Sequence, residues 1–114
     1  MYIFLHNSRC SKSREALKIM EKSKKKYTLR EYLKNPLDLD ELISLQEKLW
    51  LKAIEFTRTQ EAEFKQSNLT KESSDLEILK AMSKYPKLME RAIVYNDNSA
   101  IVCRPVEKLN DYLK

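Results

Sequence analysis

The sequence of 114 residues contains no glycine, although average usage of about 7% would give about eight. This absence excludes the dinucleotide-binding fingerprint, the P-loop and other phosphate-binding loops that depend on glycine. Two cysteines and one histidine are present. They are too few for a disulfide scaffold, and they do not form a zinc site unless carboxylates contribute. We therefore expect no metal and no bound cofactor.

Long apolar runs are also missing. No segment approaches the roughly 18 residues of a membrane span, and residues 2–5 and 92–95 are the longest candidates. The N-terminus has no basic region followed by a long apolar stretch, so we expect no secretory signal. Hydrophobic residues make up 42% of the chain and charged residues 34%, a balance typical of globular proteins. We expect a cytoplasmic monomer with a single domain over residues 1–114 and no membrane partner.

Basic residues exceed acidic ones only modestly, with a formal net charge of +5. Much of the excess lies in Lys22, Lys24, Lys25 and Lys26. We interpret this run as a solvated loop after a helix, where lysines interact favourably with the helix dipole. A nucleic-acid surface would instead spread basic residues over one face with interleaved aromatic residues. We expect no direct nucleic-acid partner.

Hydrophobic patterning predicts a strand, a helix and a second strand in the first third of the chain. Residues 2–5 are a short apolar run typical of a buried strand. Apolar residues then recur at helical spacing from Ser11 to about Lys22. Residues 27–33 return to strand-forming chemistry. A unit of this size predicts two parallel strands joined by a right-handed crossover.

The middle of the chain predicts helices with recognisable ends. Asp and Ser before a helix, with Glu three residues later, form a capping box, and a helix usually ends before proline. We expect three helical segments. The first begins at the capping pair Asp38 and Glu41 and ends at about Leu49, and the second spans residues 51–68. The third begins after Ser73 or Ser74 and ends before Pro86.

The last part of the chain predicts a β-hairpin and a closing helix. Strands are expected at residues 93–95 and 100–103, joined by Asn96, Asp97, Asn98 and Ser99. Without glycine, we expect Asn or Asp to adopt the positive φ of a tight turn. Pro105 is expected to open a helix over residues 106–113. The whole order resembles the thioredoxin-like α/β fold: a four-stranded mixed sheet, flanking helices and a helical insertion.

Cys10 lies where the first strand meets the first helix. Unpaired helix N–H groups and the helix dipole favour a thiolate there, and Arg9, Lys12 and Arg14 add positive charge. We therefore expect the pKa of Cys10 to lie below that of a free thiol. The same N–H groups form a site for an oxyanion. The alternative is a small buried plug, a common role for cysteine, but the polar neighbours favour a reactive thiol.

Two further residues of this loop limit its chemistry. Ser13 takes the place of the second cysteine of a CxxC motif. The loop therefore cannot close its own disulfide, and a redox cycle requires an external thiol. His6 either hydrogen-bonds within the loop or lies near the thiolate, and a purely structural role fits equally well.

Several short motifs recur in a fixed order that is typical of one family. They are His6-Asn7-Ser8-Arg9-Cys10-Ser11-Lys12-Ser13-Arg14, Tyr32-Leu33, Arg58 with Glu61, Lys87-Leu88-Met89-Glu90-Arg91, Ile93-Val94 and Arg104-Pro105. Together they resemble the glutaredoxin-dependent arsenate reductase (ArsC) family, in particular its short arsenate reductase-like members. The similarity covers nearly the whole chain.

The resemblance implies an oxidoreductase in which Cys10 attacks arsenate and forms a covalent adduct. Glutathione, a co-substrate, then displaces the arsenic, glutaredoxin regenerates the thiol, and arsenite is released. The family's oxyanion-binding arginines match Arg58, Arg91 and Arg104. Arginine suits this role because its planar fork donates paired hydrogen bonds, whereas each arginine taken singly is more typical of a solvated charge. The matching residues of the supporting loop are His6, Asn7, Ser13 and Arg14.

One position departs from the family pattern. The family carries a proline, normally cis, directly after the arginine that is Arg91 here, whereas this chain has Ala92. A cis bond before a residue other than proline costs about 2.5–4 kcal/mol. We therefore expect the Arg91–Ala92 bond to be trans or locally strained.

Other interpretations remain open for the function and for the second cysteine. Spx-type transcription regulators share this fold and bind RNA polymerase, but they commonly carry a CxxC switch that Ser13 interrupts. A relative that reduces another oxidised or glutathionylated substrate fits the same residues. Cys103 precedes Arg104 on a strand, where adjacent side chains face opposite sides. If Arg104 faces the site, Cys103 is a buried core thiol.

Overall fold

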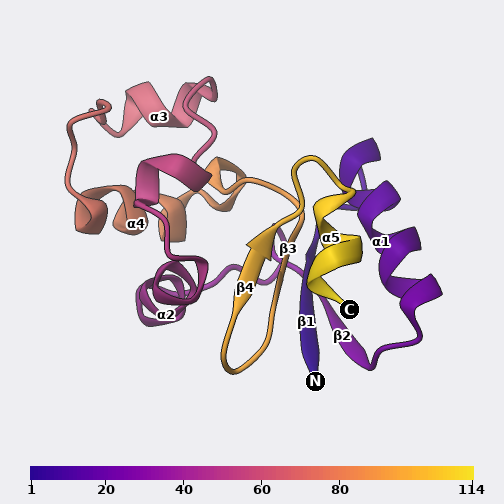
Figure 1. Ribbon diagram of the computed structural model, residues 1–114. Helices are drawn as coiled ribbons and strands as arrows, with labels where there is room; N and C mark the ends of the chain where they lie inside the picture. The colour runs from indigo at the N-terminus through magenta and orange to yellow at the C-terminus, as the bar shows by residue number, and fades with distance from the viewer. The chain divides into compact units, whose positions relative to one another are not determined.

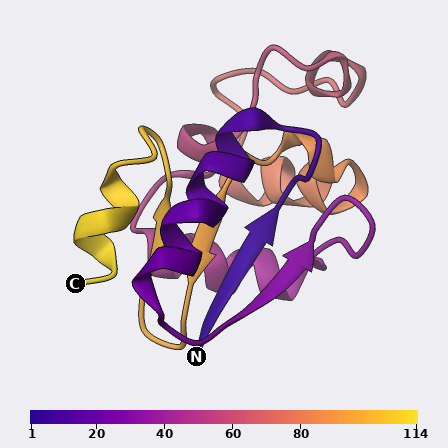
Figure 2. The same cartoon turned by 90° about the vertical axis from the view of Figure 1, so that its right-hand side faces the viewer.

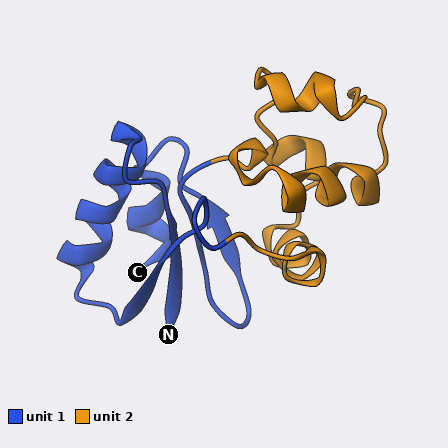
Figure 3. Ribbon diagram, turned by 180° about the vertical axis from the view of Figure 1, so that it is seen from behind, with its two compact units in different colours: residues 1–35, 91–114 blue, residues 36–90 orange.

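The computed structural model describes residues 1–114. These residues form two compact units: unit 1 contains Met1–Asn35 and Arg91–Lys114, and unit 2 contains Pro36–Glu90 (Figure 3). Whether they make up a single domain stays a prediction. No helix combines the length and the apolar character needed to traverse a bilayer.

Unit 1 contains the predicted four-stranded mixed sheet. Its strands are β1 (Tyr2–His6), β2 (Tyr27–Glu31), β3 (Ile93–Tyr95) and β4 (Ala100–Val102), arranged in the order β2-β1-β3-β4 (Figure 1). β1 runs parallel to β2 and antiparallel to β3, and β3 and β4 form the hairpin. The parallel pair requires a crossover, which α1 (Ser11–Ser23) supplies. The predicted fold class is confirmed.

One face of this sheet is covered by α1 and α5 (Lys108–Tyr112), which lie side by side in Figure 2. Ala16 and Met20, spaced by one helical turn, place the apolar side of α1 against Phe4 of β1 and Val94 of β3. All four side chains are fully buried. Burying a large apolar side chain stabilises a fold by about 1.5–3 kcal/mol, so this cluster fixes α1 on the sheet.

The turn of the hairpin differs from the prediction. None of its residues has a positive φ. Instead, the Asn96 side-chain oxygen accepts the N–H groups of Asn98 and Ser99 at 2.9 and 2.8 Å, and the Asn96 N–H donates to the Ser99 carbonyl. The side chain of Asn96 therefore makes the turn that a left-handed backbone was expected to make. The residues that do have positive φ are Lys24, Trp50 and Asn68.

Unit 2 is helical, and two of its helix starts are the predicted ones. Its elements are α2 (Leu39–Leu49), the 3-10 helix η1 (Ala53–Phe56), α3 (Ala62–Gln66), α4 (Asp75–Lys84) and the 3-10 helix η2 (Pro86–Leu88). Asp38 accepts the Glu41 N–H at 2.8 Å to cap α2, and Ser74 accepts the Glu77 N–H at 3.2 Å to cap α4. Both are complete capping boxes.

The predicted helical stretch over residues 51–68 is interrupted. Between η1 and α3 the backbone leaves helical geometry, and Thr57 forms an isolated bridge with Met89. On either side of this bridge, the Arg58 N–H donates to the Leu88 carbonyl at 2.6 Å and the Glu90 N–H donates to the Phe56 carbonyl at 2.9 Å. These long-range hydrogen bonds replace the local ones that a continuous helix would make.

Candidate active site

Cys10 is the N-cap residue of α1, with extended backbone angles of φ −101° and ψ 124°. Its carbonyl accepts the Arg14 N–H at 3.0 Å, the first hydrogen bond of the helix, and its own N–H donates to the Asn7 carbonyl at 3.0 Å. The N-cap position places a side chain beside the helix N–H groups that have no partner in the helix. The half-buried thiol therefore lies at the positive end of the dipole.

A cation reaches the sulfur from the second chain segment of unit 1, residues 91–114. The Arg91 Nε–H donates a hydrogen bond to Cys10 Sγ at 3.0 Å. Burial raises the pKa of the Cys10 thiol, but the Arg91 guanidinium and the backbone N–H groups of Ser13 and Lys12 outweigh it and lower the pKa. The predicted direction is confirmed. The side chain that donates to the sulfur is Arg91, distant in sequence, and not one of the neighbouring basic residues.

The loop before α1 is organised around the hydroxyl of Ser13. Ser13 is fully buried, and its Oγ lies 2.8 Å from His6 Nδ1 and accepts the Asn7 N–H at 3.0 Å. Arg14 closes the loop from outside by donating to the Ser8 carbonyl at 2.8 Å. The structure thus brings together the four predicted supporting residues. They shape the loop that presents the sulfur.

His6 hydrogen-bonds within the loop, as one of the two sequence-based alternatives proposed. Its side chain is buried. Burial lowers the pKa of His6, the Glu31 carboxylate raises it and Arg14 lowers it further, so that the pKa lies below its ordinary value. At neutral pH the ring is therefore uncharged. A neutral ring beside Ser13 positions the loop and adds no charge near the thiolate.

Arg91 and Arg104 flank the hairpin at the end of the sheet that carries Cys10. Leu5 of β1 pairs with Ile93, which in turn pairs with Val102. Arg91 therefore lies just before β3 and Arg104 just after β4, both at the end where β1 leads into the Cys10 loop. Arg104 is exposed. The hairpin thus places both arginines at the same end of the sheet.

Arg58 belongs to unit 2. Its guanidinium forms an ion pair with Glu61 at 2.8 Å, and Lys87 lies 4.0 Å from the same carboxylate and 3.1 Å from Glu63. Arg58 and Glu61, which the sequence paired as one motif, thus contact each other. The role of Arg58 in binding an oxyanion stays a prediction.

Two peptide bonds are cis: the bond between Arg91 and Ala92 and the bond between Arg104 and Pro105. The expectation of a trans bond between Arg91 and Ala92 is therefore wrong. Residue type alone does not determine this bond, because tertiary contacts hold both of its residues. Ala92 is fully buried and its carbonyl accepts the Cys103 N–H at 2.9 Å, while the Arg91 side chain is bound to Cys10.

Cys103 is a core thiol, as predicted. Only 2% of its surface is exposed, and it packs in the cluster between the sheet and the two helices. Burial raises its pKa to about 12. A thiol that is protonated and enclosed in this way is a poor nucleophile, so Cys10 is the candidate nucleophile of the two.

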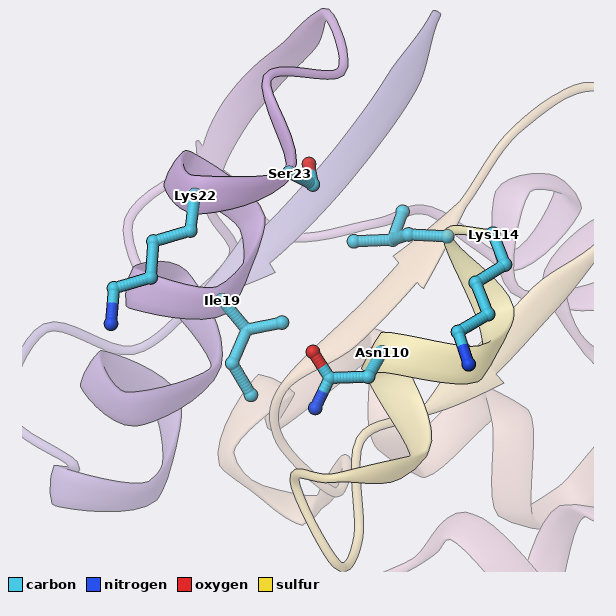
Figure 4. Close-up of a pocket in the computed structure, with 6 residues that line it drawn as sticks. Ile19, Lys22, Ser23, Asn110 and Lys114 are labelled. Atoms are coloured by element: carbon cyan, nitrogen blue, oxygen red, sulfur yellow. The ribbon is translucent and has the colours of Figure 1, made fainter.

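Two cavities of unit 1 lie at opposite ends of the sheet. One of about 210 Å³ adjoins the Cys10 loop and is lined by residues 6–9 together with Glu31, Leu33 and Lys34. Leu33 belongs to the motif Tyr32-Leu33, whereas Glu31 and Lys34 were not predicted as site residues, although the predicted parallel pairing of the first two strands places them beside the loop. The other, about 470 Å³, lies between α5 and the far end of α1, where Figure 4 shows Ile19 and Asn110 facing each other.

The arrangement around Cys10 suits nucleophilic attack on an anionic electrophile. A thiolate is the reactive form of cysteine, and here it lies beside a guanidinium and a helix N-terminus. The same donors offset the negative charge that accumulates when an oxyanion approaches a thiolate. Such a site combines a nucleophile with hydrogen-bond donors for its target.

Comparison with known proteins shows which proteins this chain resembles. An arsenate reductase of Haemophilus influenzae is 34% identical over 113 residues, which cover 97% of each chain. The uncharacterised Escherichia coli protein YfgD is 38% identical over 106 residues, which cover 91% of this chain and 89% of that protein. A solved arsenate reductase from Vibrio cholerae has a TM-score of 0.89 at 33% identity and covers 96% of this chain and 95% of that one. Residues 5–112 match the model of the ArsC family, and the chain belongs to this family.

Proposed function

We propose that this protein is a thiol-dependent oxidoreductase that reduces arsenate to arsenite through a covalent Cys10 adduct. Glutathione is the co-substrate, and glutaredoxin regenerates the thiol. The observation that carries the proposal is the hydrogen bond from Arg91 Nε to Cys10 Sγ, 3.0 Å long, at the N-terminus of α1. Relatives of similar length that are named arsenate reductases support the choice of substrate.

In the first step, the Cys10 thiolate attacks the arsenic of dihydrogen arsenate. An S–As bond forms, one As–O bond breaks and hydroxide leaves, so arsenic stays in its pentavalent state. Negative charge accumulates on the arsenate oxygens as the two anions meet. Arg91 lies beside the sulfur, and a guanidinium carries five N–H donors. It therefore can hold the thiolate and an arsenate oxygen within one planar fork.

In the second step, the glutathione thiolate attacks Cys10 Sγ. An S–S bond forms, and the electron pair of the S–As bond leaves with arsenic, which is reduced to trivalent arsenite. A glutaredoxin thiolate then attacks the glutathione sulfur of the mixed disulfide and releases Cys10 as a thiolate. Ser13 in place of a second loop cysteine is consistent with this use of external thiols, and the buried Cys103 does not compete.

The proposal is tested by arsenate-dependent oxidation of NADPH, coupled through glutathione, glutaredoxin and glutathione reductase. We expect turnover by the wild type and none by Cys10→Ser. Removing an oxyanion-binding donor costs about 10²–10³ in rate, which we expect for Arg91→Ala, and in the same direction for Arg104→Ala and Arg58→Ala. Cys103→Ala is the control, because it also removes one thiol but none of the contacts of Cys10.

The outcome also separates the alternatives. The wild type could fail to reduce arsenate and yet reduce a glutathionylated protein or a low-molecular-weight disulfide in a Cys10-dependent reaction. That result would show that the substrate is another oxidised compound and not arsenate. Failure to turn over any such substrate, together with retention on an RNA polymerase column, would favour a non-catalytic regulator.

A further inference from the structure

Positive charge is concentrated in the unit that carries the reactive thiol. Unit 1 contains fourteen lysine and arginine residues against six aspartate and glutamate residues, a formal net charge of +8. Unit 2 contains eight basic and eleven acidic residues, a formal net charge of −3. The modest net charge of the chain therefore conceals a strongly basic unit around Cys10. A field of this kind attracts anionic reactants and accelerates their association.

Three exposed cations at the Cys10 end of the sheet have no part in the proposed chemistry. Arg9 directly precedes Cys10, Lys12 lies in the first turn of α1, and Lys34 follows the end of β2. His6 pairs with Glu31 at the carboxyl ends of the two parallel strands, so the segments that follow these strands emerge at the same end. We call Arg9, Lys12 and Lys34 the cationic rim.

Two of the three residues of the cationic rim border a concave surface. Arg9 and Lys34 both line the cavity of about 210 Å³ beside the Cys10 loop, and Leu33, 39% exposed, lines the same cavity. Glu31 is the acidic residue of this cavity, and it lies 3.8 Å from Lys34. Glu15, in the second turn of α1, and Glu107, before α5, are further acidic residues of this part of unit 1. A hollow with an apolar residue and a charged border resembles a small protein–protein interface.

We propose that the cationic rim docks an acidic surface of the small dithiol protein that removes glutathione from Cys10. This rests on the proposed function and specifies the kind of protein reductant. In the step concerned, the partner's thiolate attacks the glutathione sulfur, a new S–S bond joins partner and glutathione, and Cys10 leaves as a thiolate. The partner's second thiol then displaces glutathione and closes the partner's own disulfide.

The expected effect is on association rate. Ion pairs between exposed side chains contribute only about 0–1 kcal/mol to stability, but complementary charge across an interface raises association rates substantially at low salt. Screening at physiological ionic strength acts over about 8 Å. Docking through the cationic rim is therefore strongest at low ionic strength and weakens as salt is added.

The test measures reduction of the isolated Cys10–glutathione mixed disulfide, which is prepared with oxidised glutathione. A glutaredoxin with an acidic surface around its thiol is the probe, and the second-order rate constant is followed from low to high ionic strength. In Arg9→Glu/Lys34→Glu we expect this rate constant to fall about tenfold at low salt, and its salt dependence to disappear. The matched control is Lys25→Glu/Lys26→Glu, which makes the same charge change at the opposite end of the sheet and should stay within about twofold of the wild type.

Two further measurements keep the result unambiguous. Alkylation by neutral iodoacetamide, measured at a pH where Cys10 is fully ionised, reports whether the thiolate itself is intact and accessible, and there it should be the same in all three proteins. Equal rate constants and equal salt dependence for the two double variants would overturn the proposal. So would binding of duplex DNA through the cationic rim with no change in the exchange rate. Because no arsenate is present, an absence of arsenate turnover leaves this test unaffected and contradicts only the proposed function.

Discussion

Replacing Arg91 by alanine removes the side chain that donates a hydrogen bond to Cys10 Sγ. A hydrogen bond to a charged group contributes about 1.5–3 kcal/mol, and the half-exposed sulfur favours the lower end because solvent screens the interaction. About 1.4 kcal/mol corresponds to a tenfold change in an equilibrium constant. We therefore expect the thiol–thiolate equilibrium to shift roughly tenfold towards the thiol. The pKa of Cys10 rises accordingly, and less thiolate is present at neutral pH.

The pH dependence of iodoacetamide alkylation measures this shift. The midpoint should move to higher pH in Arg91→Ala, and to a smaller extent in Arg91→Lys, which keeps the charge but lacks the planar fork. Cys103 does not interfere, because it is buried and its pKa is about 12. An unchanged midpoint in Arg91→Ala would refute the assignment of Arg91 as the cation that stabilises the thiolate, and the helix N–H groups alone would then account for it.

Three further predictions concern stability. Ser13→Ala leaves the Asn7 N–H and the buried His6 ring without their partner, and should lower the free energy of unfolding by about 1–3 kcal/mol in urea titrations. Because burial lowers the pKa of His6 in the folded state, the unfolded chain binds a proton first as pH falls below about 6.5. Wild type should therefore lose stability from pH 7 to 5 more steeply than His6→Gln. Trp50 is 92% exposed and has a φ of 58°, a left-handed conformation that asparagine adopts more readily than tryptophan. Trp50→Asn should therefore stabilise the fold by about 0.5–1 kcal/mol and raise the melting temperature. A lower melting temperature would show that the indole itself stabilises the fold.

The order of strands and helices could be predicted because its signals are local. The short apolar runs, the helical spacing after Cys10 and the capping boxes at Asp38 and Ser74 each depend on residues a few positions apart. Local signals failed where distant segments decide the backbone. The stretch after η1 leaves helical geometry because residues 56–58 hydrogen-bond to residues 88–90, and no pattern within residues 51–68 indicates this pairing.

The candidate site shows the same division. A lowered pKa for Cys10 follows from its place before a helix, which the sequence reveals. The partner cation does not, because Arg91 is 81 residues away and reaches the sulfur only when β3 pairs beside β1. The cis bond after Arg91 was missed for a related reason, since residue preference is a local property and Ala92 is held by the core.

The buried hydroxyl at position 13 has an evolutionary consequence. Changing this serine to cysteine requires a single substitution and creates two thiols spaced like those of self-oxidising proteins. A thiol is a weak hydrogen-bonding group, so the histidine ring and the backbone amide that now share the hydroxyl would lose a good partner. A lineage that gains an internal disulfide at this position therefore has to rebuild the preceding turn as well. The serine therefore links two properties: the loop stays well ordered, and the protein depends on the thiol of another molecule.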